Sequence, residues 1–373
     1  MEKNKKNKVM IICVLVAVLI VFFLEKSEEA PNVEELDIAV GIGYNITEKS
    51  DGIYYDIPFN VYYFQENGKT KSNIRQGRDK TTGQVKQERQ RESPRSYSLG
   101  FEKVVLIEEK FAKYGIRGIL DVSFNLPKFN NDAFVFVCRE NTNEYFKEDI
   151  MGYTSTSDFL YGLIKNMQDN WFFGENYKYK DLILIVDSEG RNAVLPYIEK
   201  EKDEIAIKGM ALFKGDKLKA VIDINDAKWM NILREKKSKG LLTLKKNSKE
   251  YINSYSSSQK KVKCIKNGEE CKFIIDLDIS GDIISNTMYK DLFSNTETLK
   301  NFEKLMASEI RGYLLDFVKK MQTDYRVDCL ELGKIAAAKY GRGTGVDWNE
   351  VVCRSEIEIN VRFKVNSVGR GEY

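Results

Sequence analysis

Hydrophobic and polar residues alternate with a period of two along several stretches in the second half of the chain. The clearest run extends from Ile357 to Val365, where Ile, Val and Phe are separated by Glu, Asn, Arg and Lys. This run predicts a final strand with one solvated face. The run from Phe273 to Ile279 has the same spacing and predicts a half-buried antiparallel strand. Residues 205–224 predict a hairpin, because two apolar runs flank the turn sequence Lys214–Lys217.

Apolar residues follow helical spacing in two further stretches. Those from Leu299 to Met321 form one stripe of a long amphipathic helix, and those from Phe159 to Trp171 form a shorter one. Short apolar strands are predicted at 104–107 and 134–137, so strands and helices alternate in the first half. This alternation predicts a layered α/β or α+β domain in this half, and with the later strands the whole chain is expected to be α+β.

Two polar stretches interrupt these patterns. Residues 68–95 are crowded with Lys, Arg, Gln and Asn, which is typical of a solvated loop or an exposed helix start, with a binding role as the alternative. Residues 236–261 are charged and rich in Ser, and we expect them to separate two regions of regular structure. A length of 373 residues fits two or three domains.

The N-terminus carries a membrane signal. Four lysines within residues 3–8 precede an unbroken apolar run from Val9 to Leu24. At ~1.5 Å per residue the run is about the minimum for a ~30 Å bilayer core. The lysines predict a cytoplasmic tail and an extracytoplasmic remainder. A removed signal peptide stays open as an alternative, but residues 24–29 offer no small-residue cleavage site, which favours an uncleaved anchor.

Charge and composition narrow the function classes. Lys and Arg total 59 and Asp and Glu total 56, so the net charge of +3 gives no case for nucleic-acid binding. The chain has no histidine, which excludes Ser-His and Cys-His nucleophile pairs and His-ligated zinc. Catalysis by carboxylate, Lys or Tyr stays open, but the expectation is a protein that is not an enzyme.

No motif in the sequence supports a cofactor or a metal. Gly41–Gly43 lacks the third glycine and the lysine of a phosphate-binding loop, and Gly341–Gly345 follows a predicted helix instead of a strand. Asp276, Asp278 and Asp282 do not match the calcium-loop spacing. We therefore expect no catalytic residues, no cofactor and no metal.

Two of the six cysteines form a candidate pair. Cys264 and Cys271 flank Asn267–Gly268, a hairpin-turn signal, so they could face each other across paired strands. A disulfide would require an oxidising setting, and two free thiols are the equal alternative.

Several segments, in order, resemble the Ger(x)C family, the C subunits of spore germinant receptors. Glu35–Tyr44 is similar to the opening strand of the family, and Lys103–Ile116 is similar to the strand and helix that follow. Gly209–Leu218 resembles a family hairpin, and Val318–Gly333 resembles the signature near the C-terminus. The resemblance covers residues 33–370, behind the N-terminal membrane signal.

Two departures from the family pattern stand out. Family members carry a lipid-modified cysteine before the opening strand, whereas no cysteine lies between Leu24 and Leu36 here. A transmembrane anchor is therefore expected to replace the lipid. The usual His-Arg-Lys-Tyr-Pro stretch is Ala337–Gly341 in this chain, which puts any role of that His or Pro in doubt and suggests a divergent paralogue.

The resemblance implies about three mixed α/β domains with antiparallel sheets behind one transmembrane segment. Residues 1–32 are expected to be a cytoplasmic basic tail, anchor and stalk. Residues 33–205 would form the N-terminal region, with 33–100 and 101–205 as an optional subdivision. Residues 206–373 would form the C-terminal α+β domain.

The resemblance also implies a role in germination without catalysis. The chain would work with a multi-spanning A-type subunit and a transporter-like B-type subunit in the spore inner membrane, as a docking or signal-coupling component. Candidate contact residues are Tyr54 and Tyr62 on a tyrosine-rich strand and Arg342 and Thr344 in the glycine-rich loop. The alternatives are an anchored extracytoplasmic solute-binding protein and, last, an anchored wall-active enzyme.

Overall fold

The computed structural model describes residues 10, 12–20, 32–65, 68–202, 204–268, 270–289, 292 and 295–368. Residues 12–20, within the predicted apolar segment, are helical, and the rest of that segment lies almost entirely outside the described residues. Within these limits, no helix is both long enough and apolar enough to cross a membrane. The transmembrane anchor therefore stays a prediction.

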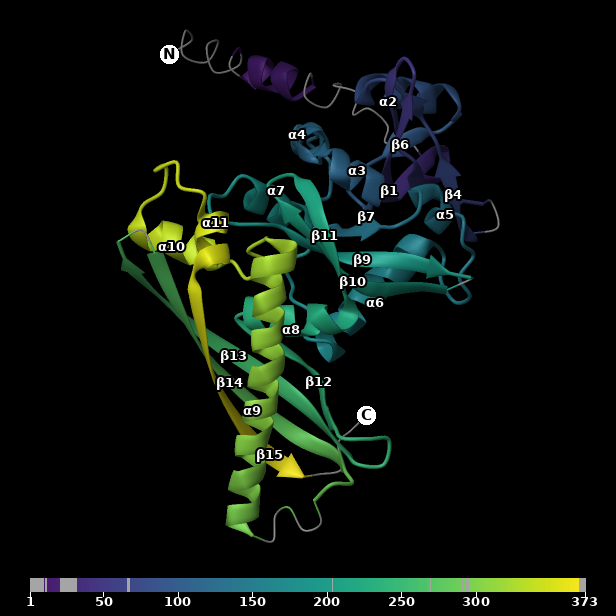
Figure 1. Ribbon diagram of the computed structural model, residues 1–373. Helices are drawn as coiled ribbons and strands as arrows, with labels where there is room; N and C mark the ends of the chain where they lie inside the picture. Colours follow the sequence, from purple (N-terminus) through teal and green to yellow (C-terminus); the bar gives the residue numbers. More distant parts are fainter. Residues whose placement is uncertain are drawn as a thin grey trace, which may run out of the picture.

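Residues 36–223 contain the strands of a large mixed sheet of 11 strands, which occupies the upper part of the molecule (Figure 1). Its path is β11-β10-β9-β8-β7-β1-β2-β5; off this path, β3 and β6 pair with β1, and β4 pairs with β3. The strands are β1 (Leu36–Lys49), β2 (Gly52–Asp56), β3 (Phe59–Phe64), β4 (Thr70–Arg75), β5 (Arg78–Asp79), β6 (Ser96–Ser98), β7 (Val104–Glu108), β8 (Phe134–Cys138), β9 (Val194–Glu201), β10 (Glu204–Lys214) and β11 (Lys217–Asp223).

Helices cover both faces of this sheet. They are α2 (Thr82–Arg91), α3 (Glu109–Tyr114), α4 (Arg117–Phe124), α5 (Thr142–Phe146), α6 (Thr156–Asn170), α7 (Tyr179–Val186) and α8 (Ile224–Arg234), after a short 3-10 turn η1 (Val33–Glu35). Val105 and Ile107 of β7 lie in a core shared with α3, α4 and α7. Val104 and Leu106, one position away, lie in the opposite core with α5, α6 and α8. This alternation explains why β7 is apolar at four consecutive positions.

The second half forms a sheet of 4 strands in the order β12-β13-β14-β15. These are β12 (Lys237–Lys245), β13 (Tyr251–Asn267), β14 (Glu270–Asn286) and β15 (Glu356–Val368). The long helix α9 (Thr296–Lys320) lies along one face of the sheet (Figure 1). It begins at Asn295, whose side chain accepts the backbone N–H of Glu297, and it ends in the π-helical turn η2 (Met321–Tyr325). Helices α10 (Leu332–Tyr340) and α11 (Trp348–Arg354) then lead into β15.

The prediction of antiparallel sheets is wrong for the central strands. β1, β7, β8 and β9 are parallel neighbours, and β15 runs parallel to β14. Parallel neighbours need long crossover connections, and here these contain α3 to α7 in the first sheet and α9 to α11 in the second. The α+β class itself is confirmed, with mixed sheets in place of antiparallel ones.

The Ser-rich stretch 236–261 is not a separating segment, because it forms β12 and most of β13. Ser238, Ser254, Ser256 and Ser258 are buried on the inner face of this sheet. The Ser238 and Ser258 hydroxyls lie 2.7 Å apart and bond to each other. Serine satisfies its polar atom locally here, so the stretch is strand in spite of its polar composition.

The proposed division at residue 205 falls inside β10, which pairs with β9 on one side and β11 on the other. One buried core also continues from α6 and α8 into the 4-stranded sheet. Helix α8 lies between the two sheets in Figure 1, in contact with both β10 and α9. The division into domains at this point stays a prediction.

Candidate functional site

Tyr54 lies in β2, where its side chain contacts charged side chains of the same surface. Its hydroxyl donates to Asp51 at 2.7 Å, and the Lys49 Nζ atom lies 4.2 Å from its ring centre. Lys80 and Tyr54 together lower the pKa of Asp51 to about 2. Tyr54 therefore belongs to a small charged surface cluster.

Tyr62 lies in β3 and is used inside the molecule. Its hydroxyl donates to Asp158 in the first turn of α6, and Asp158 also pairs with Lys103. The Lys103 Nζ atom lies 3.4 Å from the Tyr62 hydroxyl. These contacts fasten α6 to the edge of the large sheet.

Arg342 and Thr344 lie in the exposed loop between α10 and α11. The loop is held from one side by Glu189, which accepts the backbone N–H of Gly343 at 2.7 Å and the Trp348 Nε1–H at 3.1 Å. The structure does not bring the two predicted pairs of contact residues, Tyr54 with Tyr62 and Arg342 with Thr344, into one surface. The tyrosine strands lie at the upper right of Figure 1 and α10 and α11 at the left.

Cys264 and Cys271 lie on one buried face of the β13–β14 hairpin. Cys264 is opposite Phe273 and Cys271 is opposite Lys266, so the two cysteines are diagonal neighbours. Both thiols are free in the structure. Burial, with a further contribution from Cys271, raises the pKa of the Cys264 thiol to about 12. The disulfide stays a prediction.

The most connected polar site lies where the two halves of the chain meet, and we call it the junction. Its centre is the turn from Asp328 to Glu331, together with Leu332 and Gly333 at the start of α10. The Asp328 carboxylate is fully buried and accepts three backbone N–H groups, from Leu330 at 3.1 Å, Leu332 at 3.3 Å and Gly333 at 2.7 Å. Burial raises the pKa of Asp328, although these three bonds oppose the effect. The turn is therefore shaped around one carboxylate.

Gly333 fits this turn because no side chain could be accommodated easily. A Cβ atom there would lie 3.0 Å from the Gly190 carbonyl oxygen, 3.1 Å from Trp348 and 3.2 Å from the Asp328 carboxylate. Glu331, two residues before Gly333, has a left-handed backbone with φ of 60°. Left-handed backbone is uncommon outside glycine, so the fold must hold this residue in place.

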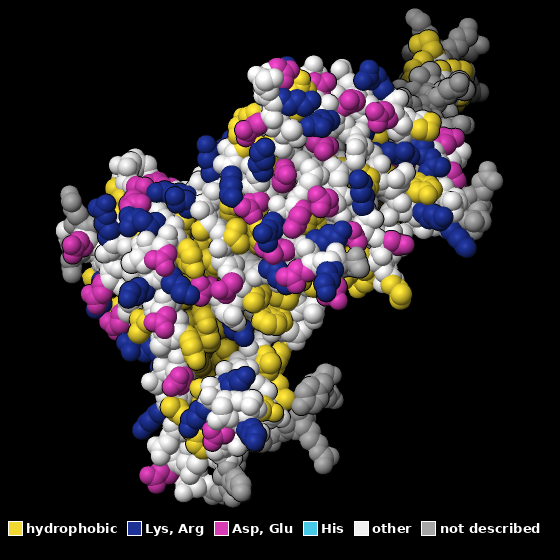
Figure 2. Space-filling model, turned by 45° about the vertical axis from the view of Figure 1, so that its right-hand side comes forward, with side chains coloured by type: hydrophobic (Ala, Val, Ile, Leu, Met, Phe, Trp, Pro, Cys, Tyr) yellow, Lys and Arg dark blue, Asp and Glu magenta, His cyan; other side chains and the backbone are white. Residues whose placement is uncertain are grey.

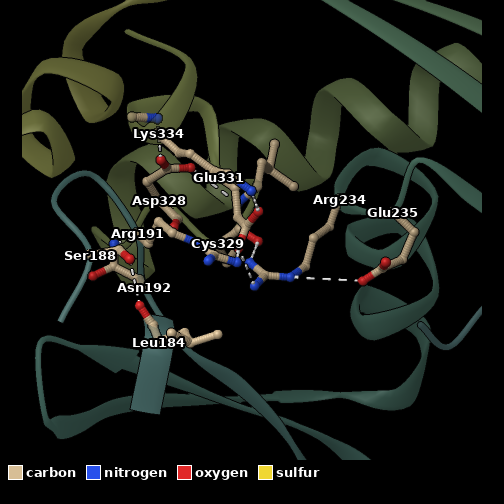
Figure 3. A network of polar contacts seen from close by, with 12 residues as sticks. Leu184, Ser188, Arg191, Asn192, Arg234, Glu235, Asp328, Cys329, Glu331 and Lys334 are labelled. Carbon is tan, nitrogen blue, oxygen red and sulfur yellow. Dashed lines mark hydrogen bonds and ion pairs between the residues drawn. The ribbon is translucent and has the colours of Figure 1, made fainter. Parts of the chain in front are cut away.

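Two arginines that precede the 4-stranded sheet in the chain hold Glu331. The Arg191 Nε atom donates to the Glu331 carboxylate at 2.9 Å, and an Arg234 nitrogen does so at 3.2 Å. Burial alone would raise the pKa of Glu331, but Arg234, Arg191 and Lys334 lower it to about 2. Figure 3 shows Arg234 extending from the end of α8 toward this turn.

Neutral groups complete the junction. Arg234 also donates to the Cys329 carbonyl at 2.6 Å, and it is only 8% exposed. The Asn192 side chain donates to the Asp328 carbonyl at 3.2 Å and to Asn349 at 2.9 Å. Asn349 in turn accepts the Asp328 N–H at 2.8 Å. The loop before β9, the end of α8, the turn and α11 are thus locked together.

The arrangement is suited to holding two structural units in a fixed relation. Its charges are paired and mostly buried, and removing one partner of such a pair costs about 3–5 kcal/mol. In the part of the chain that the structure describes, no group of three acidic or cysteine side chains could hold a metal ion.

Of the junction residues, the family resemblance had pointed to Asp328 and Gly333. Sequence analysis missed Arg191, Arg234 and Glu331, because no motif around these residues predicts that they form ion pairs.

Two family models describe almost all of the chain beyond the N-terminal segment. "Spore germination protein N-terminal domain" matches residues 29–200, and "Spore germination B3/ GerAC like, C-terminal" matches residues 208–369. The chain therefore belongs to the Ger(x)C family of spore germination proteins, which confirms the resemblance.

Individual relatives are distant but cover nearly the whole chain. The chain is 21% identical over 345 residues to the spore germination protein GerQC of Bacillus cereus, across 90% of this chain and 93% of that one. It also resembles the crystal structure of the GerBC protein, with a TM-score of 0.56 and 13% identity, over 88% of this chain and 98% of that one. The second likeness shows a shared fold.

Proposed function

We propose that the chain is the C subunit of a nutrient germinant receptor, without catalytic activity of its own, which docks with an A-type and a B-type membrane subunit. The observation that carries this proposal is the coverage by two spore germination family models of residues 29–200 and 208–369. The junction supports it, because a rigid connection between two sheets suits a component that transmits a mechanical signal.

The anchor is part of the same proposal. A transmembrane helix formed by Val9–Leu24 would keep the folded part at the outer face of the spore inner membrane. Tethering of this kind raises the effective concentration of a binding surface near its partners without adding contacts.

The surface offers candidate contacts for partners. Figure 2 shows acidic and basic side chains interspersed over one face, with hydrophobic side chains gathered where the upper and lower parts of the molecule meet. Tyr313 on α9 is 44% exposed and stacks on Trp229 of α8, with ring centres 4.9 Å apart. Exposed aromatic residues of this kind are enriched at protein interfaces.

A genetic experiment tests the role. Spores lacking this chain should fail to germinate in at least one nutrient, and the intact gene should restore the response. The loop variant Arg342→Ala/Thr344→Ala should restore it less well than Tyr62→Phe, which keeps the ring. Normal germination of the deleted spores in all nutrients that stimulate the parent strain would contradict the proposal.

A further inference from the structure

A cavity lies in the N-terminal part of the chain, between helices α2 and α4 and the outer strands of the large sheet. Its volume is about 630 Å³. Pockets for small molecules are typically about 300–1,000 Å³ and mostly apolar. Aromatic and aliphatic side chains form most of this wall, among them Tyr44, Phe59, Tyr97 and Phe129.

Helix α2 places an arginine in this apolar wall. The helix begins at Thr81, whose hydroxyl accepts the backbone N–H of Gln84. Val85 and Arg89, four residues apart on one face of the helix, are its buried residues. An arginine therefore occupies a position where the helix faces the protein interior.

Arg89 is buried without a compensating charge. It is 6% exposed, and its guanidinium carbon lies 3.5 Å from the centre of the Phe59 ring. One nitrogen donates to the Ile57 carbonyl at 2.9 Å, whereas its Nε atom has no hydrogen-bond partner among the described residues. Burial lowers the pKa of Arg89 to about 10. Buried charges are otherwise paired, so this arrangement needs an explanation.

The nearby carboxylates serve other groups. Asp37 accepts from Arg75 at 2.7 Å and from Ser93 at 2.9 Å. Glu102 accepts the backbone N–H groups of Gly100 at 3.0 Å and Asn130 at 2.9 Å. Neither pairs with Arg89 in the described part of the chain.

The charged side chains that line the pocket are all positive. Lys86, Arg89 and Arg95 contribute to the lining, and no Asp or Glu does so among the described residues. Arg95 has Asp37 at 4.0 Å as a partner, which leaves Arg89 as the buried cation to be matched. A larger cleft of about 1490 Å³ beside β12 is lined by charges of both signs and selects no ligand class.

We propose that the pocket around Arg89 binds a small, water-soluble organic carboxylate with an apolar body. The guanidinium, stacked on Phe59, would meet the carboxylate with its free N–H edge, a geometry that arginine favours. The apolar body would lie against Tyr97 and Phe129. A zwitterionic amino acid fits less well, since its ammonium group would find no acid in the lining. This inference does not rest on the proposed receptor role.

Calorimetric titration of the full chain in detergent tests the proposal, with 3-phenylpropionate as the probe at up to millimolar concentration. We expect saturable binding at one site, and binding at least about tenfold weaker for 3-phenylpropanol and for phenylalanine. Arg89→Met should weaken binding of 3-phenylpropionate by at least about tenfold. Arg91→Met, the same change at an exposed position of the same helix, should leave it unchanged.

Absence of saturable binding, or equal binding by Arg89→Met, would overturn the proposal. Thermal unfolding separates a ligand role from a packing role, because removing an unmatched buried charge should leave Tm equal or higher. If Arg89→Met does not fold, Val122→Trp replaces it. Val122 is 40% exposed and lines the pocket, so a bulky ring there should block binding without touching Arg89. Binding equal to the parent in a folded Val122→Trp would count against the pocket.

Discussion

At the scale of single residues, Glu331 shows how an exceptional backbone conformation is maintained. Its left-handed φ of 60° is unfavourable by itself, yet its carboxylate joins Arg191 and Arg234, which precede it by 140 and 97 residues. The paired charges therefore stabilise both the turn and the contact between the two halves.

Glu331→Gln should destabilise the folded chain by about 3 kcal/mol or more, because the buried Arg234 and the half-buried Arg191 lose the carboxylate that they share. The folded pKa of about 2 lies below the ordinary glutamate pKa of 4.5, so the carboxylate stabilises the fold above pH 4.5. This stabilisation should be lost as the pH falls from 4.5 toward 2. Thermal unfolding of the full chain at several pH values measures both effects.

Glu309→Gln on the exposed side of α9 is the matched control and should leave Tm nearly unchanged. Equal Tm values for Glu331→Gln and the parent at neutral pH would show that the junction contributes nothing to stability.

The buried thiols give a second prediction at this scale. Burial of both hairpin cysteines, together with the raised pKa of the Cys264 thiol, should make them unreactive toward iodoacetamide in the folded chain near neutral pH. Mass spectrometry after unfolding in the alkylating reagent distinguishes two free thiols, which label at once, from a disulfide, which labels only after reduction. Rapid labelling of Cys264 in the folded chain would contradict the burial.

At the scale of helices and strands, sequence periodicity located most elements but not their pairing. The stripe from Leu299 to Met321 and the apolar run 104–107 correspond to α9 and β7. The alternating run 357–365 is β15, yet it pairs parallel to β14, because periodicity reports burial and says nothing of strand direction.

The elements that sequence analysis missed are strands and helices in stretches of polar composition. The Ser-rich β12 and β13 are one case. Residues 68–95 are another, because β4, β5 and α2 lie in a stretch that is typical of a solvated loop. Arg89 is part of that stretch, and its burial could not be inferred from a composition that marks exposure.

Gly333→Ala tests the junction as a structural element. The added Cβ would meet three neighbours at 3.0–3.2 Å, so we expect destabilisation of about 1–3 kcal/mol. Gly312→Ala in α9 is the control, since a Cβ there would meet no atom of the described residues within 4 Å. That change should stabilise the helix by about 0.5–1 kcal/mol. Chemical denaturation compares the two, and a stabilised Gly333→Ala would contradict the close packing.

At the scale of the whole molecule, the sequence identified the family because its similar segments are spread over nearly the full length of the chain. It could not predict the junction, since Arg191 and Glu331 are 140 residues apart and meet only in the folded molecule. Nor could it select a partner surface. The structure places Tyr54 and Arg342 on separate parts, with Tyr62 used inside the fold.

The most direct test of the proposed receptor role is to tag the chain at its C-terminus in the spore-forming host and identify what co-purifies from detergent-solubilised spore membranes. The account predicts recovery of one A-type and one B-type receptor subunit in amounts comparable to the tagged chain. The Arg89→Met variant should recover them equally, which keeps this test independent of the carboxylate pocket. A tagged, folded chain that purifies without either subunit would contradict the account.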